Sequence, residues 1–163
     1  MDGLKQVGLR LNILIFTLSY GIILLALTTA SDILKNVPRQ IKDQNIVIVE
    51  DDDAIAQALN TYFSAQNTVQ ICNSAEEAIA AEANFHDIDV FILDYKLPGK
   101  NGAELFEHLQ GRFREAKYIL ITGELNYDLA ERTRQIGFDA LILKPFDFTI
   151  LDDNIASLIT TSA

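Results

Sequence analysis

The sequence has a single cysteine and few basic residues. Cys72 has no second cysteine with which to form an internal disulfide, and it lies in an apolar run, Val69-Gln70-Ile71-Cys72, typical of a buried strand. We interpret it as a small core residue without a functional role. The 13 Lys and Arg are outnumbered by 23 Asp and Glu, which gives a net charge of −10. This charge argues against nucleic acid as the main partner, because binding to phosphate backbones requires a surface rich in Lys and Arg.

Several catalytic patterns are also missing. There is no glycine-rich nucleotide loop, and no Ser-His-Asp set can be assembled. The two histidines, His86 and His108, lack a metal-ligand companion at a useful spacing, and we expect both to face solvent. The sequence therefore offers neither a nucleotide-binding loop nor a hydrolase triad.

Charged residues are absent from residues 11–31, a stretch dominated by Leu and Ile. About twenty helical residues span roughly 30 Å, the thickness of the hydrocarbon core of a bilayer. We therefore predict a transmembrane helix over 11–31 in an N-terminal segment 1–32, followed by a linker over 33–44. Residues 1–44 carry a net charge of +2 and the remainder −12. Slightly more Lys and Arg follow the helix than precede it, which favours an orientation in the cytoplasmic membrane with residues 45–163 facing the cytoplasm.

Two alternatives for this stretch stay open. Thr28-Thr29-Ala30 resembles a small-residue cleavage site, as at the end of a signal peptide. The helix could instead be buried against a partner protein or a second copy of the chain. A homodimer could form in that way, and the protein would be cytoplasmic if the helix does not span a membrane.

Residues 45–163 alternate short apolar runs with helical patterns. The runs are rich in Val and Ile and predict five strands, several of them apolar without a break, as in strands covered on both faces: Asn45–Glu50, Thr68–Asn73, Ile88–Asp94, Lys117–Thr122 and Ala140–Lys144. Apolar residues at helical spacing predict helices near residues 55–63, 105–113, 127–136 and 148–158, and a composition rich in Ala and Glu favours a helix over 75–83. This order implies an α/β fold with a parallel sheet in three layers.

Reactive side chains follow the ends of four predicted strands. The first strand ends in Glu50-Asp51-Asp52-Asp53, the third in Asp94, the fourth in Thr122 and the fifth in Lys144. The carboxyl ends of parallel strands meet at one edge of the sheet, so these groups should converge. Crowded carboxylates repel one another unless a cation lies among them, and oxygen ligands suit Mg²⁺. One Asp at a strand end is commonly a helix cap, but the joint occurrence predicts a site.

Over about residues 45–160 the chain resembles the response-regulator receiver domain. The resemblance rests on four motifs in order: Ile46-Val47-Ile48-Val49-Glu50-Asp51-Asp52, Asp94-Tyr95-Lys96-Leu97-Pro98-Gly99-Lys100-Asn101-Gly102, Ile121-Thr122-Gly123 and Leu143-Lys144-Pro145-Phe146. It implies a five-stranded, flavodoxin-like sheet of order 2-1-3-4-5 over residues 45–163. It also implies a stand-alone receiver of a two-component or phosphorelay system, similar to chemotaxis-type receivers.

The resemblance implies a role for each site residue. Asp94 would be the nucleophile that accepts a phosphoryl group from a histidine kinase or a histidine phosphotransfer protein. Mg²⁺ would be bound directly by Asp51, Asp94 and the backbone carbonyl of Lys96, and through water by Glu50.

Two further groups would contact the phosphoryl group after transfer. Thr122 would donate a hydrogen bond to it, and Lys144 would form an ion pair with it. The bond from Lys144 to Pro145 is expected to be cis. The phosphorylated site would then change a surface that meets an unknown protein target.

Three residues vary the family pattern. Many receivers carry Tyr or Phe three residues before the lysine, where this chain has Leu141, so its output mechanism is open. Lys96 and Glu124 lie two residues beyond Asp94 and Thr122. We expect them to influence water access, and their opposite charges allow them to pair with each other.

A receiver is a signalling module and not a turnover enzyme, and two other functions are alternatives to it. A Mg²⁺-dependent phosphatase resembling the haloacid dehalogenase group requires Asp-x-Asp-x-Thr after the first strand, but Asp51-Asp52-Asp53-Ala54-Ile55 lacks the Thr. The other alternative is a pseudo-receiver, an interaction module that works without phosphate. Leu141 is its only support.

Overall fold

The computed structural model describes residues 41–124 and 127–160. The chain divides into two units, Met1–Val37 and Pro38–Ala163, and all of the described residues belong to the second. The helix predicted over 11–31 lies outside the described residues, as does most of the predicted linker. Within the two described ranges, no helix combines the length and the apolar character needed to cross a membrane.

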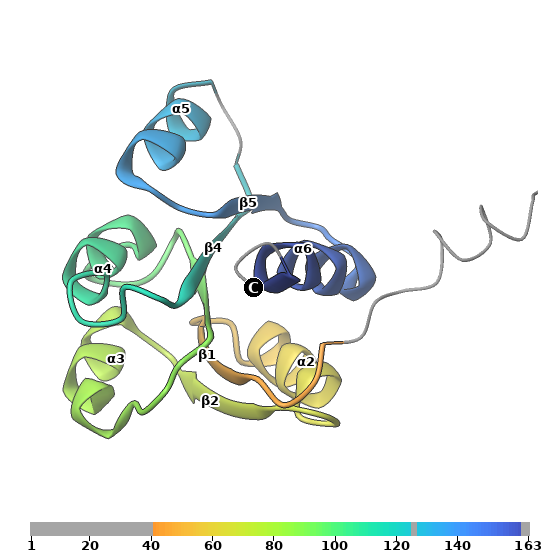
Figure 1. Cartoon of the computed structure of the whole chain (residues 1–163). Coiled ribbons are helices and arrows are strands. Elements are labelled where there is room, and N and C mark those ends of the chain that lie inside the picture. Colours follow the sequence, from red (N-terminus) through yellow and green to blue (C-terminus); the bar gives the residue numbers. More distant parts are fainter. Residues whose placement is uncertain (1–40, 125–126, 161–163) are drawn as a thin grey trace, which may run out of the picture. The chain divides into compact units, whose positions relative to one another are not determined.

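Five parallel strands form one sheet in the order β2-β1-β3-β4-β5 (Figure 1). The strands are β1 (Asn45–Val49), β2 (Thr68–Cys72), β3 (Val90–Asp94), β4 (Lys117–Thr122) and β5 (Ala140–Leu143). The helices between and after them are α2 (Asp53–Phe63), α3 (Ala75–Ala81), α4 (Gly102–Leu109), α5 (Tyr127–Ile136) and α6 (Phe148–Thr160). The predicted fold class and strand order are confirmed.

Polar side chains fix where three of these helices begin. Asp52 caps α2 by accepting hydrogen bonds from the backbone N–H groups of Ala54 and Ile55. Ser74 caps α3, and Asn101 caps α4 in a reciprocal arrangement with Glu104. Side-chain oxygens at these positions satisfy backbone donors that have no partner inside the helix. Of these caps, Asp52 directly follows Asp51, one of the residues of the predicted site.

Two predicted helices end earlier than expected. The helix predicted near 105–113 is α4, which begins at Gly102 and ends at Leu109. The sequence indicated a helix over 75–83, whereas α3 ends at Ala81 and a 3-10 turn, η1, follows over Glu82–Asn84. The turn closes with a hydrogen bond from the N–H of Phe85 to the carbonyl of Glu82. This tighter turn directs Phe85, only 3% exposed, into the core.

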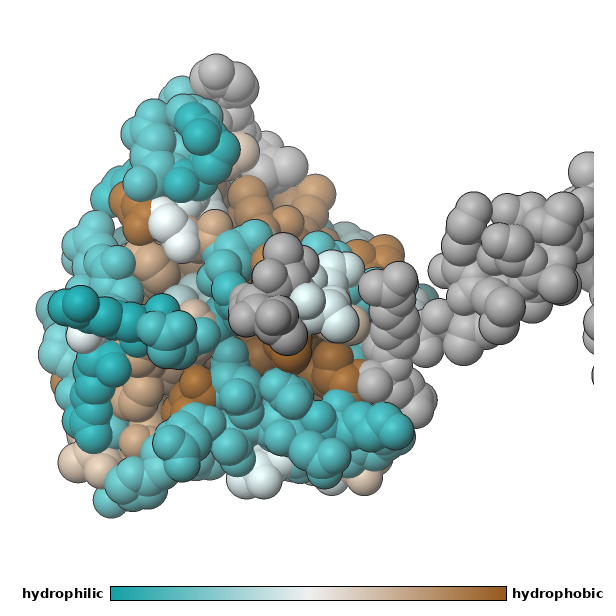
Figure 2. All heavy atoms as spheres, in the orientation of Figure 1, coloured by the Kyte–Doolittle hydropathy of each residue, from teal (hydrophilic) through white to brown (hydrophobic). Residues whose placement is uncertain are grey.

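The sheet separates two apolar layers. Val47, Val49, Phe91 and Leu93 face the layer that contains α3 and α4, while alternate residues such as Ile46 and Ile92 face the layer that contains α2 and α6. Figure 1 shows α2 and α6 together on one face of the sheet and α3, α4 and α5 on the other. In Figure 2 the outward surfaces of the helices are mostly hydrophilic, with hydrophobic residues showing mainly between them. Burial on both faces explains why the strands are almost continuously apolar.

The packing of the domain begins before β1, at Ile41. The side chain of Ile41 is 8% exposed, and its N–H donates to Asp152 Oδ1 of α6 at 3.0 Å. Its carbonyl accepts a hydrogen bond from Asn67 Nδ2 at 3.2 Å. Asp152 is itself buried, and burial, together with the charge of Asp153, raises its pKa against the effect of the hydrogen bonds that it accepts from the N–H of Ile41 and the hydroxyl of Tyr62. A carboxylate of α6 therefore fastens the residues that lead into the sheet.

Candidate functional site

The strand register brings the predicted site residues to one edge of the sheet. Val49 pairs with Leu93, so that Glu50 and Asp94 follow on neighbouring strands. Asp94 in turn pairs with Ile121, the residue before Thr122. The N–H of Lys144 donates to the carbonyl of Thr122 at 2.7 Å. Four strands therefore contribute to the site, as the sequence predicted.

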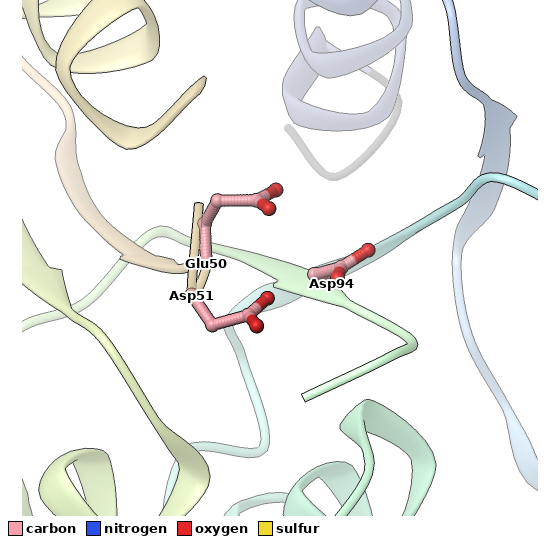
Figure 3. Close-up of side chains that lie close together, drawn as sticks. All are labelled: Glu50, Asp51 and Asp94. Atoms are coloured by element: carbon pink, nitrogen blue, oxygen red, sulfur yellow. The ribbon is translucent and has the colours of Figure 1, made fainter. Parts of the chain in front are cut away.

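Three carboxylates lie close together at this edge. Glu50, Asp51 and Asp94 each offer an oxygen that lies within 4.8 Å of the others. Figure 3 shows the side chains of Glu50 and Asp51, which follow β1, and that of Asp94 at the end of β3, with their carboxylates gathered in one region. Glu50 and Asp94 are buried, at 2% and 5% exposed, whereas Asp51 is exposed. This arrangement gives the site one open carboxylate and two enclosed ones.

Lys144 links the two buried carboxylates. Its Nζ lies 2.9 and 2.7 Å from the two oxygens of Glu50, and 3.1 Å from Asp94 Oδ1. The expected cis bond between Lys144 and Pro145 is confirmed. An ammonium shared between two buried carboxylates offsets their repulsion and holds both in place.

The pKa values of this group follow from burial and charge. Burial raises the pKa of Glu50, and the charge of Asp94 adds to this, while the hydrogen bond from Lys144 opposes it. Burial lowers the pKa of Lys144, but its hydrogen bond to Glu50 and the charge of Asp94 outweigh that effect, so its pKa lies above the ordinary value. Lys144 therefore remains a cation in the site at neutral pH.

The hydroxyl of Thr122 is directed toward Glu124. Its Oγ1 donates to the Glu124 carbonyl at 2.9 Å and accepts from the Glu124 N–H at 3.2 Å. The carboxylate of Glu124 forms an ion pair with Lys96, as anticipated from the sequence. Leu141 is half-buried and packs against the core layer beneath α3 and α4. The structure thus brings Thr122 to the site edge with its hydroxyl bonded to Glu124.

Gly102 allows a close approach of the backbone beside Asp94, a role that was not predicted from the sequence. A Cβ atom on Gly102 would lie 2.3 Å from the carbonyl oxygen of Asp94 and 3.0 Å from a methyl group of Leu120. The N–H of Gly102 donates to the carbonyl of Tyr95 at 3.1 Å. The available signal was a glycine immediately after the Asn101 cap, and it marks the point where α4 begins against the backbone of β3.

The family model described as the response regulator receiver domain matches residues 46–156. The chain belongs to the response regulator receiver family. Its described part carries the fold and the acidic pocket of a receiver, a signalling module of two-component systems. Receiver domains generally bind Mg²⁺ at such a pocket and interact with histidine kinases or phosphotransfer proteins.

Curated relatives agree with this membership. The receiver is 32% identical over 107 residues to the transcriptional regulatory protein MalR of Bacillus subtilis, covering 64% of this chain and 45% of that protein. It is 26% identical over 119 residues to the two-component response regulator PhoP of Pseudomonas aeruginosa, covering 72% and 52%. The chain therefore spans about half the length of these relatives.

Solved receiver structures superpose on the chain. A CheY-like receiver domain protein from Methanospirillum hungatei is 25% identical with a TM-score of 0.64, covering 74% of this chain and 99% of that one. The response regulator DrrB of Thermotoga maritima, at 22% identity and a TM-score of 0.67, covers 74% and 54% and shares the fold.

Proposed function

We propose that this receiver accepts a phosphoryl group on the carboxylate of Asp94 from the phosphohistidine of a histidine kinase or a phosphotransfer protein. The observation that carries the proposal is the position of Asp94. Its carboxylate lies 3.1 Å from the ammonium of Lys144 and within 4.8 Å of oxygens from Glu50 and Asp51. A buried carboxylate next to a fixed cation is a nucleophile in a place where the negative charge of a donor can be neutralised.

The charges of the site fit a magnesium ion. Glu50, Asp51 and Asp94 bring three negative charges, and Lys144, which contacts Glu50 and Asp94, brings one positive charge, so these four residues have an excess of two negative charges. Asp51 forms no ion pair among residues 41–124 and 127–160, so its oxygens remain available. Asp51, Asp94 and the backbone carbonyl of Lys96 would hold Mg²⁺, with Glu50 acting through water. When bound, Mg²⁺ supplies positive charge that offsets the charge of the phosphoryl oxygens.

The residues of the chain contribute position and charge to the transfer. A carboxylate oxygen of Asp94 forms a bond to phosphorus while the phosphorus–nitrogen bond of the donor breaks, and the donor imidazole takes up a proton. The product is an acyl phosphate. Because phosphoryl transfer has a loose transition state, orientation and charge neutralisation are the main catalytic effects. Lys144 supplies a cation beside Asp94, and Thr122 donates its hydroxyl to a phosphoryl oxygen once it leaves Glu124.

The result of phosphorylation is a change in a protein–protein surface, and the target is an unknown protein. Hydrolysis of the acyl phosphate returns Asp94 to its free carboxylate, so the receiver catalyses its own phosphorylation and dephosphorylation without turning over an external substrate. Leu141 occupies a position that couples the site to the surface. A half-buried leucine exposes or buries less surface area on changing rotamer than an aromatic ring would at this position. Its identity supports one alternative, an interaction module that works without phosphate.

A phosphorylation assay tests the proposal. Acetyl phosphate with Mg²⁺ should give an acid-stable, base-labile protein phosphate that is lost in Asp94→Asn and in the presence of EDTA. Asp87→Asn is the matched control, because Asp87 is an exposed aspartate that precedes the same strand. Steady release of phosphate from small esters would instead favour a phosphatase. Absence of incorporation at every Mg²⁺ concentration would favour the phosphate-independent module.

We also propose that the apolar stretch 11–31 anchors the receiver in the cytoplasmic membrane, with residues 45–163 facing the cytoplasm. The support is the sequence alone, namely about twenty uncharged, Leu- and Ile-rich residues. Alkaline carbonate should leave the full chain in the membrane fraction and release a chain that lacks residues 1–37. Intact full-length protein in the wash would contradict a spanning helix.

A further inference from the structure

The hydroxyl of Thr122 forms two hydrogen bonds with the backbone of Glu124. Thr122 is fully buried at the end of β4, and its Oγ1 donates to the Glu124 carbonyl while accepting from the Glu124 N–H. A hydroxyl has one proton to donate. While that proton lies on the Glu124 carbonyl, it is not available to an oxygen bound to Asp94. Phosphorylation must therefore compete with the backbone of Glu124 for this hydrogen bond.

Glu124 is held from outside by Lys96. The ammonium of Lys96 and the carboxylate of Glu124 form an ion pair that joins the loop after β3 to the loop after β4. Their side chains are 56% and 71% exposed. An exposed pair of this kind changes an equilibrium only modestly, by about two- to fivefold. The ion pair nevertheless matters for the site, because it restrains Glu124, the residue whose backbone binds the hydroxyl of Thr122.

We propose that Glu124 is a positioning residue that keeps the Thr122 hydroxyl away from Asp94, and that Lys96 reinforces this resting arrangement. The inference rests on the proposed function, in which Asp94 takes the phosphoryl group. A phosphoryl oxygen is a charged acceptor and forms a stronger hydrogen bond than a neutral carbonyl. The phosphoryl oxygen therefore draws the hydroxyl of Thr122 away from Glu124. Breaking the hydrogen bond to Glu124 lowers the affinity of the site for the phosphoryl group, and the Lys96–Glu124 pair increases this loss of affinity.

Removing either charge of the pair should ease activation. Beryllofluoride with Mg²⁺, a phosphoryl mimic, is titrated into the full chain, and the half-saturating concentration is compared for wild type, Lys96→Gln, Glu124→Gln and the double variant. We expect a coupling of about two- to fivefold between the two substitutions, which shrinks toward one in concentrated salt. Exchanging the charges, with Lys96→Glu and Glu124→Lys together, should restore the wild-type value.

Matched controls come from another exposed ion pair. Arg134 and Glu131 of α5 lie 2.8 Å apart, so Arg134→Gln and Glu131→Gln make the same changes in net charge away from the site. These controls should leave the half-saturating concentration within experimental error of wild type. Equal shifts in the controls, or an exchanged-charge variant that behaves like the single variants, would overturn the role of the pair.

A second readout separates positioning of Thr122 from a general effect of charge on anion binding. In the protein without beryllofluoride, hydrogen exchange of the Glu124 amide reports its hydrogen bond to Thr122. Exchange should become about two- to fivefold faster in Lys96→Gln. Unchanged exchange would overturn the positioning role. If wild type itself binds no beryllofluoride with Mg²⁺, the proposed function fails and this inference fails with it.

Discussion

Replacing Lys144 by methionine should destabilise the receiver in a way that depends on pH. Methionine keeps the length of the side chain but removes the ammonium that lies 2.7 Å from Glu50 and 3.1 Å from Asp94. Both carboxylates are almost fully buried, so the substitution leaves two negative charges facing each other without a cation. Removing one partner of a fully buried ion pair costs about 3–5 kcal/mol, and since the Lys144 side chain is 19% exposed, we expect about 2–3 kcal/mol at neutral pH.

The sign of the pH dependence follows from the pKa of Glu50. Burial already raises this pKa in the wild type, and loss of Lys144 raises it further. A carboxyl group whose pKa is higher in the folded state binds its proton more tightly there, so stability is greatest below the pKa of the unfolded chain and falls as the pH rises through that of the folded state. The destabilisation of Lys144→Met should therefore be large at neutral pH and small below about pH 4.

Urea denaturation followed by circular dichroism measures this effect, in EDTA and at several pH values. Lys117→Met is the matched control, because Lys117 lies 3.6 Å from Asp139 in a more exposed pair and should lose less than about 1 kcal/mol. Added Mg²⁺ should recover part of the stability of Lys144→Met, because the excess of negative charge at the site has grown. Equal stability of the two variants at neutral pH, or a loss independent of pH, would refute the reasoning.

Three further substitutions test particular contacts. Gly102→Ala places a Cβ 2.3 Å from the carbonyl oxygen of Asp94, so we expect the free energy of unfolding in urea to fall by about 1–3 kcal/mol and Asp94 to be phosphorylated more slowly. Wild-type values for both would contradict the close approach. Asp152→Asn removes a buried carboxyl whose pKa is raised, while its amide oxygen can still accept a hydrogen bond from the N–H of Ile41. As the pH rises above about 4, the free energy of unfolding should therefore fall less in the variant than in the wild type, and parallel pH profiles would contradict this. Asn101→Ala removes the cap of α4 and should cost about 1 kcal/mol in thermal or urea unfolding, whereas Asn101→Asp should retain most of the stability; equal losses would argue against capping.

The sequence predicted those parts of the structure that depend on local pattern. Val and Ile runs located the strands, and the residue following each run identified the edge where Glu50, Asp94, Thr122 and Lys144 meet. This prediction succeeds because parallel strands align their carboxyl ends, whatever the side chains between them. The burial of Cys72 and the exposure of both histidines are also confirmed.

Contacts that depend on the tertiary fold could not be predicted in the same way. The hydrogen bond between Asp152 and Ile41 joins residues 111 positions apart, and a charged residue on a helix ordinarily indicates a solvated face. The direction of the Thr122 hydroxyl is likewise decided by the backbone turn at Glu124, which no side-chain pattern specifies. The sequence indicated which groups meet at the site, and the structure shows which of them are bonded to each other.

Chemical mapping of the phosphorylated residue tests the account most directly. Borohydride reduces an aspartyl phosphate to homoserine, so the full chain is incubated with acetyl phosphate and Mg²⁺, reduced, digested and sequenced by mass spectrometry. The account predicts homoserine at position 94 only when Mg²⁺ is present. The homoserine should be strongly reduced in the Lys144→Met protein and absent from the Asp94→Asn protein. Homoserine at Asp51 or at another carboxylate, or none in the wild type, would contradict it.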